Sequence, residues 1–179
     1  MEETYFQHYF KSLPETRVKK GEILLSAGDI SSKVYYVQEG CLRSYLIDDN
    51  GKEHIYQFAP EDWVISDEEA LLQQKPALLF IDAVEDSVVK ILNRPANLKE
   101  DNVDPETALQ ILDKFEKKVN SLRSRIIQLL SASAEERYSV FVKTYPNLIQ
   151  RVPQKMIASY LGITPESLSR VRKEILNKK

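Results

Sequence analysis

The sequence predicts an α+β fold in which a strand-rich N-terminal part is followed by helices alone. Three observations indicate this fold: short β-branched and aromatic runs separated by turn residues up to about residue 93, an apolar heptad pattern after Pro105, and two short capped helical segments near the end. We expect an antiparallel, jelly-roll-like β-roll over 1–103, a long helix over 104–133 and a helix-turn-helix domain over 134–179.

The composition is typical of a globular protein and excludes several kinds of site. Hydrophobic residues make up 42% of the 179 residues and charged residues 29%. No apolar run approaches the length of roughly 20 residues that spans a bilayer, and no signal peptide is apparent, so we expect a cytoplasmic protein without a membrane partner. With Cys41 as the only cysteine and only His8 and His54 as histidines, we expect no disulfide, metal or other cofactor.

Charge is distributed unevenly along the chain. Residues 1–100 contain 11 Lys or Arg and 18 Asp or Glu, whereas residues 151–179 contain seven and two. The C-terminal segment can therefore meet a polyanion that the N-terminal segment would repel.

The N-terminal part contains several predicted strands. A short aromatic helix is expected over 1–16, ending near Pro14. The dipeptide Asn50-Gly51 predicts a hairpin with a type I′ turn, because both residue types tolerate positive φ angles. The expected strands are Val34–Val37, Leu42–Ile47, His54–Phe58, Leu78–Ile81 and Ser87–Leu92.

A heptad pattern predicts one long helix from Pro105 to Ser131, with Asp104 as its N-cap. One interpretation is an amphipathic helix that lies on its own sheet. Ile111, Ile127 and Leu130 widen the apolar surface, which favours a parallel homodimer of such helices. The alternating steps of four and three join Ala108, Leu112, Phe115, Val119, Leu122, Ile126 and Leu129. The expected dimer interface comprises Leu112, Phe115, Val119, Leu122 and Ile126.

The C-terminal segment predicts a helix-turn-helix. A first helix begins at Pro153 and ends at Gly162, which permits a left-handed turn, and Thr164 caps the next helix. Ala158 supplies the small residue that lets the helices approach. A helical hairpin in a core would have a less polar second helix, so the pattern predicts binding of double-stranded DNA at a palindromic site. The residues expected to fill the angle between the helices are Ile157, Leu161, Ile163, Leu168 and Val171.

Each polar position of this segment has an expected role. Arg170 is the candidate for a bidentate contact with guanine. Glu166 can accept from a cytosine amino group or orient Arg170 four residues later. Ser167 and Ser169 can reach bases or phosphates. The expected phosphate contacts are Gln154, Lys155, Thr164 and Lys173.

The order of parts resembles the Crp/Fnr family of bacterial transcription regulators. The resemblance is carried by KKGEILLSAGDISSKVYYVQEGCLRSYLIDDNGKEHIYQFAPEDWV and by IASYLGITPESLSRVRKEI, and it covers nearly the whole chain. It implies a dimeric, sequence-specific regulator whose cyclic-nucleotide-binding-like β-roll senses an effector. It also implies RNA polymerase and an unidentified small-molecule effector as further partners.

The chain departs from that family at the expected ligand pocket. The arginine and serine that hold the cyclic phosphate in the family align with Pro76 and Ala77, and the ribose-binding glutamate aligns with Ser66. The acidic run Asp67–Glu69 would repel an anion, so we predict no response to cyclic AMP. The family's terminal β-hairpin wing is expected to be missing. The candidate effector pocket comprises Trp63, Ser66, Glu68 and Leu78.

Two other functions are consistent with a β-roll. An enzyme of the cupin type needs clustered histidine and carboxylate ligands, but the β-roll segment offers only His54. A small-molecule or protein-interaction module would leave the basic C-terminal segment without a purpose. We therefore expect a regulator rather than an enzyme.

Overall fold

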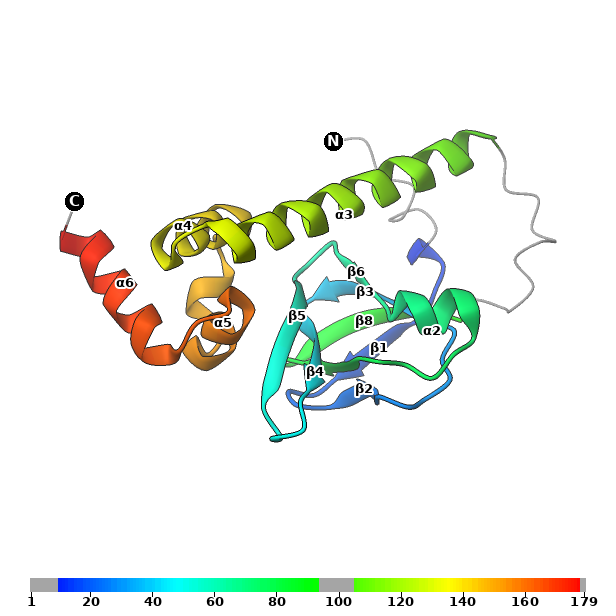
Figure 1. Ribbon diagram of the computed structural model, residues 1–179. Coiled ribbons are helices and arrows are strands. Elements are labelled where there is room, and N and C mark those ends of the chain that lie inside the picture. Colours follow the sequence, from blue (N-terminus) through cyan, green and yellow to red (C-terminus); the bar gives the residue numbers. More distant parts are fainter. Residues whose placement is uncertain (1–9, 94–104, 178–179) are drawn as a thin grey trace. The chain divides into compact units, whose positions relative to one another are not determined.

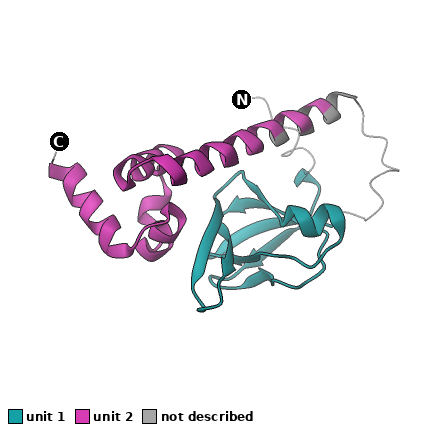
Figure 2. Ribbon diagram, in the orientation of Figure 1, with its two compact units in different colours: residues 1–102 teal, residues 103–179 magenta. Residues whose placement is uncertain are grey.

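The computed structural model describes residues 10–93 and 105–177, and the chain divides into two compact units. The first comprises residues Met1–Asn102 and the second Val103–Lys179 (Figure 2). Most of the helix expected over 1–16 lies outside the described residues, as does the expected N-cap Asp104.

Eight strands of the first unit form two four-stranded antiparallel sheets (Figure 1). One sheet has the order β1-β8-β3-β6 and the other β2-β7-β4-β5, which confirms the predicted β-roll. One short helix, α2 (Glu68–Gln73), follows β6. The strands are β1 (Glu15–Val18), β2 (Ile23–Leu25), β3 (Lys33–Glu39), β4 (Leu42–Ile47), β5 (Glu53–Ala59), β6 (Val64–Ile65), β7 (Phe80–Ala83) and β8 (Ser87–Asn93).

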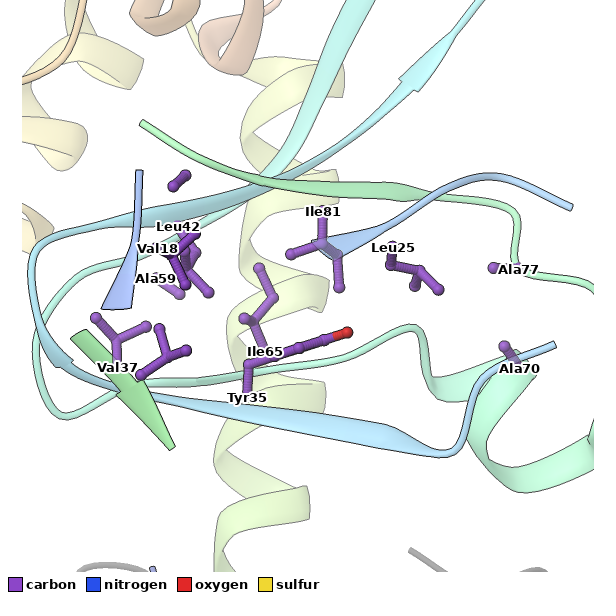
Figure 3. Packing of buried hydrophobic residues seen from close by; sticks show 12 residues of the cluster. Val18, Leu25, Tyr35, Val37, Leu42, Ala59, Ile65, Ala70, Ala77 and Ile81 are labelled. Carbon is purple, nitrogen blue, oxygen red and sulfur yellow. The ribbon is translucent and has the colours of Figure 1, made fainter. Parts of the chain in front are cut away.

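Apolar side chains from both sheets fill the interior of the β-roll (Figure 3). The ring of Tyr35 lies within this core, and its hydroxyl donates to the Leu24 carbonyl over 2.8 Å. Burial, followed by the charge of Asp29, raises the pKa of Tyr35 to about 12. The core residues are Val18, Leu25, Tyr35, Val37, Leu42, Ala59, Ile65, Ala70, Ala77, Ile81, Ala83 and Val89.

The turn between β4 and β5 differs from the predicted type I′ turn. Gly51 has a φ of 75°, but Asn50 does not have a positive φ, and the Gly51 amide donates to the Asp48 carbonyl over 2.8 Å. The Asp48 carboxylate accepts from the amides of Asn50 and Lys52, which holds this part of the chain in place. The prediction was wrong because the Asp48 side chain, which precedes the turn, accepts hydrogen bonds from the amides that follow it.

The strand expected over Leu78–Ile81 begins two residues later, at Phe80. The buried carboxylate of Asp67 accepts from the backbone amides of Leu78 and Leu79, at 2.9 and 3.0 Å. Its other oxygen accepts from the Ala70 amide at 3.0 Å and caps α2. Two amides that could have joined the sheet ladder are thus bound by a side chain.

A buried ion pair joins β4 to β7. Arg43 and Asp82 stand opposite each other in the strand register, and each is only 5% exposed. The guanidinium donates from Nε and Nη2 to the two carboxylate oxygens, at 2.6 and 2.8 Å. Its Nη1 donates to Glu53 at 2.6 Å, and the group lies 4.2 Å from the ring centroid of Tyr45. Burial lowers the pKa of Arg43, but the hydrogen bonds and charges of Asp82 and Glu53 outweigh it and raise the pKa overall.

The described part of the second unit consists of helices joined by turns. The long helix α3 spans Pro105–Ser131, as predicted, and is followed by α4 (Ala134–Thr144), the 3-10 helix η1 (Leu148–Gln150), α5 (Gln154–Leu161) and α6 (Pro165–Asn177). Ser133 and Glu136 form a capping box at the start of α4, which separates it from α3. Both α5 and α6 pack against α4. Their shared core comprises Tyr138, Phe141, Tyr145, Leu148, Val152, Ile157, Ala158, Leu161, Leu168 and Val171.

Candidate nucleic-acid interface

A tight glycine turn joins α5 to α6. Gly162 has a φ of 66°, and the amides of Gly162 and Ile163 donate to the carbonyls of Ser159 and Ala158, each over 3.0 Å. This is a Schellman motif, in which the left-handed residue satisfies the last carbonyls of a helix. A Cβ atom at Gly162 would lie 3.2 Å from Cδ2 of Leu129, so α3 also approaches the turn closely. The predicted left-handed turn is confirmed.

The beginnings of both helices follow from their capping residues. The Thr164 hydroxyl accepts from the Ser167 amide over 3.2 Å, and Pro165 is the first residue of α6, as predicted. Pro153 differs from the prediction: its ψ of 137° is extended, so it lies just before α5 and the helix begins at Gln154. Its carbonyl accepts from the amide of Met156 at 2.9 Å.

The apolar residues expected between the helices lie inside the unit. Ala158 and Leu168 are fully buried where the helices cross, and Ile157, Leu161 and Val171 are buried beside them. Ile163, in the turn, is half-buried. These contacts fix the angle between α5 and α6 and leave the opposite side of α6 to solvent.

The eight predicted DNA-contacting residues are polar and solvent-accessible, and together we call them the α6 polar face. Two lie in the first turn of α5 and the others lie from the cap of α6 to its third turn. Ser167 is half-buried and the other seven are exposed. The face comprises Gln154, Lys155, Thr164, Glu166, Ser167, Ser169, Arg170 and Lys173.

Hydrogen bonds orient the charged groups of the α6 polar face. Arg170 Nη2 donates to the Ser167 hydroxyl oxygen over 3.3 Å, and the Thr164 hydroxyl donates to the same oxygen over 3.2 Å. Hydrogen bonds from its own amide and from Thr164, together with the charge of Arg170, lower the pKa of Glu166. The ionised carboxylate of Glu166 thus lies one helical turn before the guanidinium of Arg170. The hydroxyl oxygen of Ser167 accepts hydrogen bonds from Thr164 and Arg170.

An apolar stripe on α3 is exposed in the single chain. Leu112, Val119 and Ile126 are 63%, 59% and 58% exposed, and Leu122 is half-buried. Phe115, the fifth predicted interface residue, has a side chain outside the described part. These positions recur along one side of the helix at alternating intervals of three and four residues. A row of large apolar side chains in water is typical of a surface that another molecule covers.

The four residues of the candidate effector pocket extend from the interior to the surface of the β-roll. Trp63 is half-buried and packs against the apolar core. Ser66 is buried, and its hydroxyl donates to Glu68 at 3.4 Å. Leu78 is 66% exposed. The four side chains thus lie at different depths, and the set stays a prediction.

Sequence reasoning missed two arginines that lie behind the turn. Arg125 of α3 donates from Nη2 to the Tyr160 carbonyl over 3.1 Å and stacks 4.1 Å from the centroid of the Tyr160 ring. Arg137 of α4 brings its Nη1 within 3.8 Å of the point where a Cβ of Gly162 would lie. The heptad pattern consists of apolar positions alone and therefore does not include Arg125. The spacing of Ser121, Arg125 and Gln128 would have indicated a second, polar contact side of α3.

Within the described ranges, no three His, Cys, Asp or Glu side chains gather closely enough to hold a metal ion. No helix in those ranges is both long enough and apolar enough to cross a bilayer.

Comparison with known proteins finds a similar domain and similar regulators. Residues 15–99 match the cyclic nucleotide-binding domain family. The chain is 30% identical over 172 residues to the anaerobic regulatory protein of Haemophilus influenzae, covering 86% of this chain and 63% of that relative. It also resembles the structure of FixK2 from Bradyrhizobium japonicum, with a TM-score of 0.80, 21% identity, and coverage of 93% of this chain and 85% of the other. A transcriptional regulator of the CRP/FNR family from Thermus thermophilus has a TM-score of 0.70 at 18% identity, covering 92% and 87%. These similarities agree with the resemblance to the Crp/Fnr family that the sequence carries.

The relatives are named as regulators rather than enzymes. They include the regulatory protein HlyX of Actinobacillus pleuropneumoniae, which is 29% identical over 171 residues, covering 86% of this chain and 68% of that protein. The chain spans 63% of the length of the first two relatives it matches. The structural likenesses, at 21% and 18% identity, show the fold.

Proposed function

We propose that this chain is a dimeric, sequence-specific DNA-binding regulator of transcription of the Crp/Fnr family that acts in the cytoplasm. The observation that carries the proposal is the α6 polar face, which projects from a helix-turn-helix with a buried apolar crossing. RNA polymerase and an unidentified small molecule are the further partners that a regulator of this family would meet.

In the proposed complex, α6 enters the major groove with its N-terminal half toward the bases. Arg170 is exposed and oriented by Ser167, so its planar fork can donate to O6 and N7 of a guanine. Glu166 can accept from a neighbouring cytosine amino group. Lys155 of α5 and Lys173 of α6 are exposed and would bind phosphates, which set the register without selecting sequence.

The exposed apolar stripe of α3 supports the dimer. Covering Leu112, Val119 and Ile126 with the same stripe of a second copy removes these side chains from water, which is favourable by about 25 cal/mol per Å² of apolar area. A parallel pair places two α6 polar faces at the same end of the two-fold axis, one on either side of it. Such a pair would bind half-sites about one turn of DNA, or about 10 base pairs, apart.

The Arg170→Ala variant tests the proposed reading residue. We expect its affinity for the preferred site to fall by about 1–3 kcal/mol, because the bidentate contact with guanine is lost, and its base preference at that position to relax. The matched variant Lys173→Ala should weaken binding to all sequences alike and reduce the slope of log affinity against log salt by about one. Fluorescence anisotropy with the preferred and point-changed duplexes measures both effects. Unchanged selectivity in Arg170→Ala would remove this residue from base recognition.

We further propose that the β-roll does not bind cyclic AMP. Pro76 and Ala77 supply no cation or hydroxyl at the expected phosphate position. The amides of Leu78 and Leu79, which follow directly, already donate to the buried Asp67 carboxylate. A cyclic phosphate would have to displace a charged acceptor that three amides hold, and it would approach a carboxylate of like charge.

Calorimetric and thermal titrations with cyclic AMP test this proposal. We expect no saturable heat, and no rise in the unfolding midpoint at millimolar nucleotide. A ligand present at about 1,000 times its Kd would raise the free energy of unfolding by about 4 kcal/mol, so micromolar binding could not be overlooked. Saturable binding in the micromolar range would contradict the proposal.

A further inference from the structure

A cavity of about 270 Å³ lies within the second unit, between the C-terminal half of α3, α4 and α5. Three helices contribute to its wall, so it is not a groove along any one of them. Ser124, Arg125 and Gln128 come from α3, Arg137 and Thr144 from α4, and Tyr160 from α5. The volume is close to the lower end of the range for small-molecule sites, about 300–1,000 Å³.

The polar part of the cavity wall is cationic. Two guanidinium groups, those of Arg125 and Arg137, lie among hydroxyl groups and one amide. Of the described residues that line the cavity, none is an Asp or Glu. Guanidinium groups keep their charge at every physiological pH, so the cavity favours an anion.

One of these cations has an unused donor. The Nε of Arg137 is buried and makes no hydrogen bond to any residue in the described part of the chain. Buried donors in proteins almost always have a partner, and one that lacks a protein partner indicates a bound water, ion or ligand. Arg137 is also one of the residues that line the cavity, and its guanidinium gives the wall a positive charge.

Three aromatic rings, together with aliphatic side chains, form the less polar part of the wall. The ring centroid of Phe141 lies 5.2 Å from that of Tyr145 and 5.5 Å from that of Tyr160. The Tyr145 and Tyr160 rings are 5.9 Å apart and nearly perpendicular. Such a cluster offers both faces and edges to a planar group.

We propose that this cavity binds a small organic anion with a single planar ring, its acid group on Arg137 and its ring against Phe141, Tyr145 and Tyr160. A carboxylate or phosphate can accept charge-assisted hydrogen bonds from a guanidinium group of the cavity wall. The proposed contacts come from α4, its C-cap and α5, and the cavity wall also includes Ser124 and Gln128 of α3, so a ligand that fills the cavity would join the long helix to the helix-turn-helix. An effect on DNA binding rests on the proposed function, whereas the binding itself does not.

The test is a titration of the full chain without DNA, monitored by the methyl NMR signals of Leu129, Val140 and Leu161, which line the cavity. The probes are benzoate and phenyl phosphate, with benzylamine as the cation of matching shape and inorganic phosphate as the ringless anion. We expect saturable shifts with benzoate or phenyl phosphate and at least about tenfold weaker ones with the other two. No saturable shift at millimolar benzoate and phenyl phosphate, or equal binding of benzylamine, overturns the proposal. Equal binding of inorganic phosphate means an adventitious ion only and also overturns it.

Two variants locate the site. Arg137→Gln removes the cation, and Ser124→Leu fills the cavity from an exposed helix position without changing charge. We expect each to weaken benzoate binding about tenfold or more. The control Arg123→Gln removes a cation from an exposed position of α3 that does not line the cavity, and should bind as the parent chain does. If both site variants, folded by circular dichroism, bind benzoate like the parent chain, the assignment is wrong. Because DNA is absent, such a failure leaves the proposed regulator function untouched.

Discussion

The Val119→Glu variant is expected to be monomeric at micromolar concentration, where the parent chain is expected to be dimeric. Val119 is 59% exposed at the middle of the α3 stripe. In a parallel symmetric pair each stripe residue meets its own copy, so one substitution places two carboxylates against each other in an apolar interface. Sedimentation equilibrium measures the change. DNA affinity should fall about 100-fold or more, because the two half-sites are then bound independently.

A charge-swap experiment separates loss of pairing from loss of folding. The Val119→Lys variant should also be monomeric alone, but mixing it with Val119→Glu should restore a heterodimer and DNA binding. Asn120→Glu adds the same charge at the next, exposed position of α3 and should remain dimeric. A parent chain that stays monomeric, or a Val119→Glu variant that stays dimeric, would show that α3 does not form the proposed interface.

The Arg43→Met variant is expected to lower the free energy of unfolding of the β-roll by about 3–5 kcal/mol. The substitution keeps an unbranched apolar stem but leaves Asp82, which is 5% exposed, as a buried charge without its bidentate partner. Arg43→Lys keeps the charge but not the fork, so its effect should be smaller. The single tryptophan, Trp63, packs against the β-roll core, so its fluorescence in a urea titration reports on this unit.

A surface ion pair in the same unit provides the control. Lys19 and Asp86 form an ion pair at 2.8 Å with both side chains largely exposed. Lys19→Met should leave the urea midpoint almost unchanged, because water screens such pairs. The double variant Arg43→Met with Asp82→Leu should regain much of the loss, since no buried charge remains unpaired. Equal midpoints for Arg43→Met and the parent chain would show that the ion pair does not stabilise the unit.

The sequence predicted those elements that are determined by residues close to one another in the chain. The boundaries of α3 follow from Pro105 and an uninterrupted heptad, and the glycine turn follows from Gly162 with apolar residues on either side. The exposed positions of the α6 polar face follow from helical periodicity once the cap at Thr164 is known. All of these depend on residues within a few turns of each other.

Features that depend on partners distant in sequence could not be predicted in this way. Arg43 and Asp82 are 39 residues apart and meet only because β4 and β7 are neighbours. The later start of β7 depends on Asp67, 11 residues before the amide of Leu78 that it binds. The cavity requires three helices to pack with space between them, and no single helix carries that signal.

The most direct measurement of the central claim is selection of bound duplexes from a random DNA pool by the full chain. Two paired copies that each present an α6 polar face predict enrichment of an inverted repeat, with half-site centres about 10 base pairs apart. The Val119→Glu variant should enrich no such repeat. If the parent chain enriches no sequence at low salt, or enriches single half-sites without symmetry, the account of a dimeric DNA-reading regulator is contradicted.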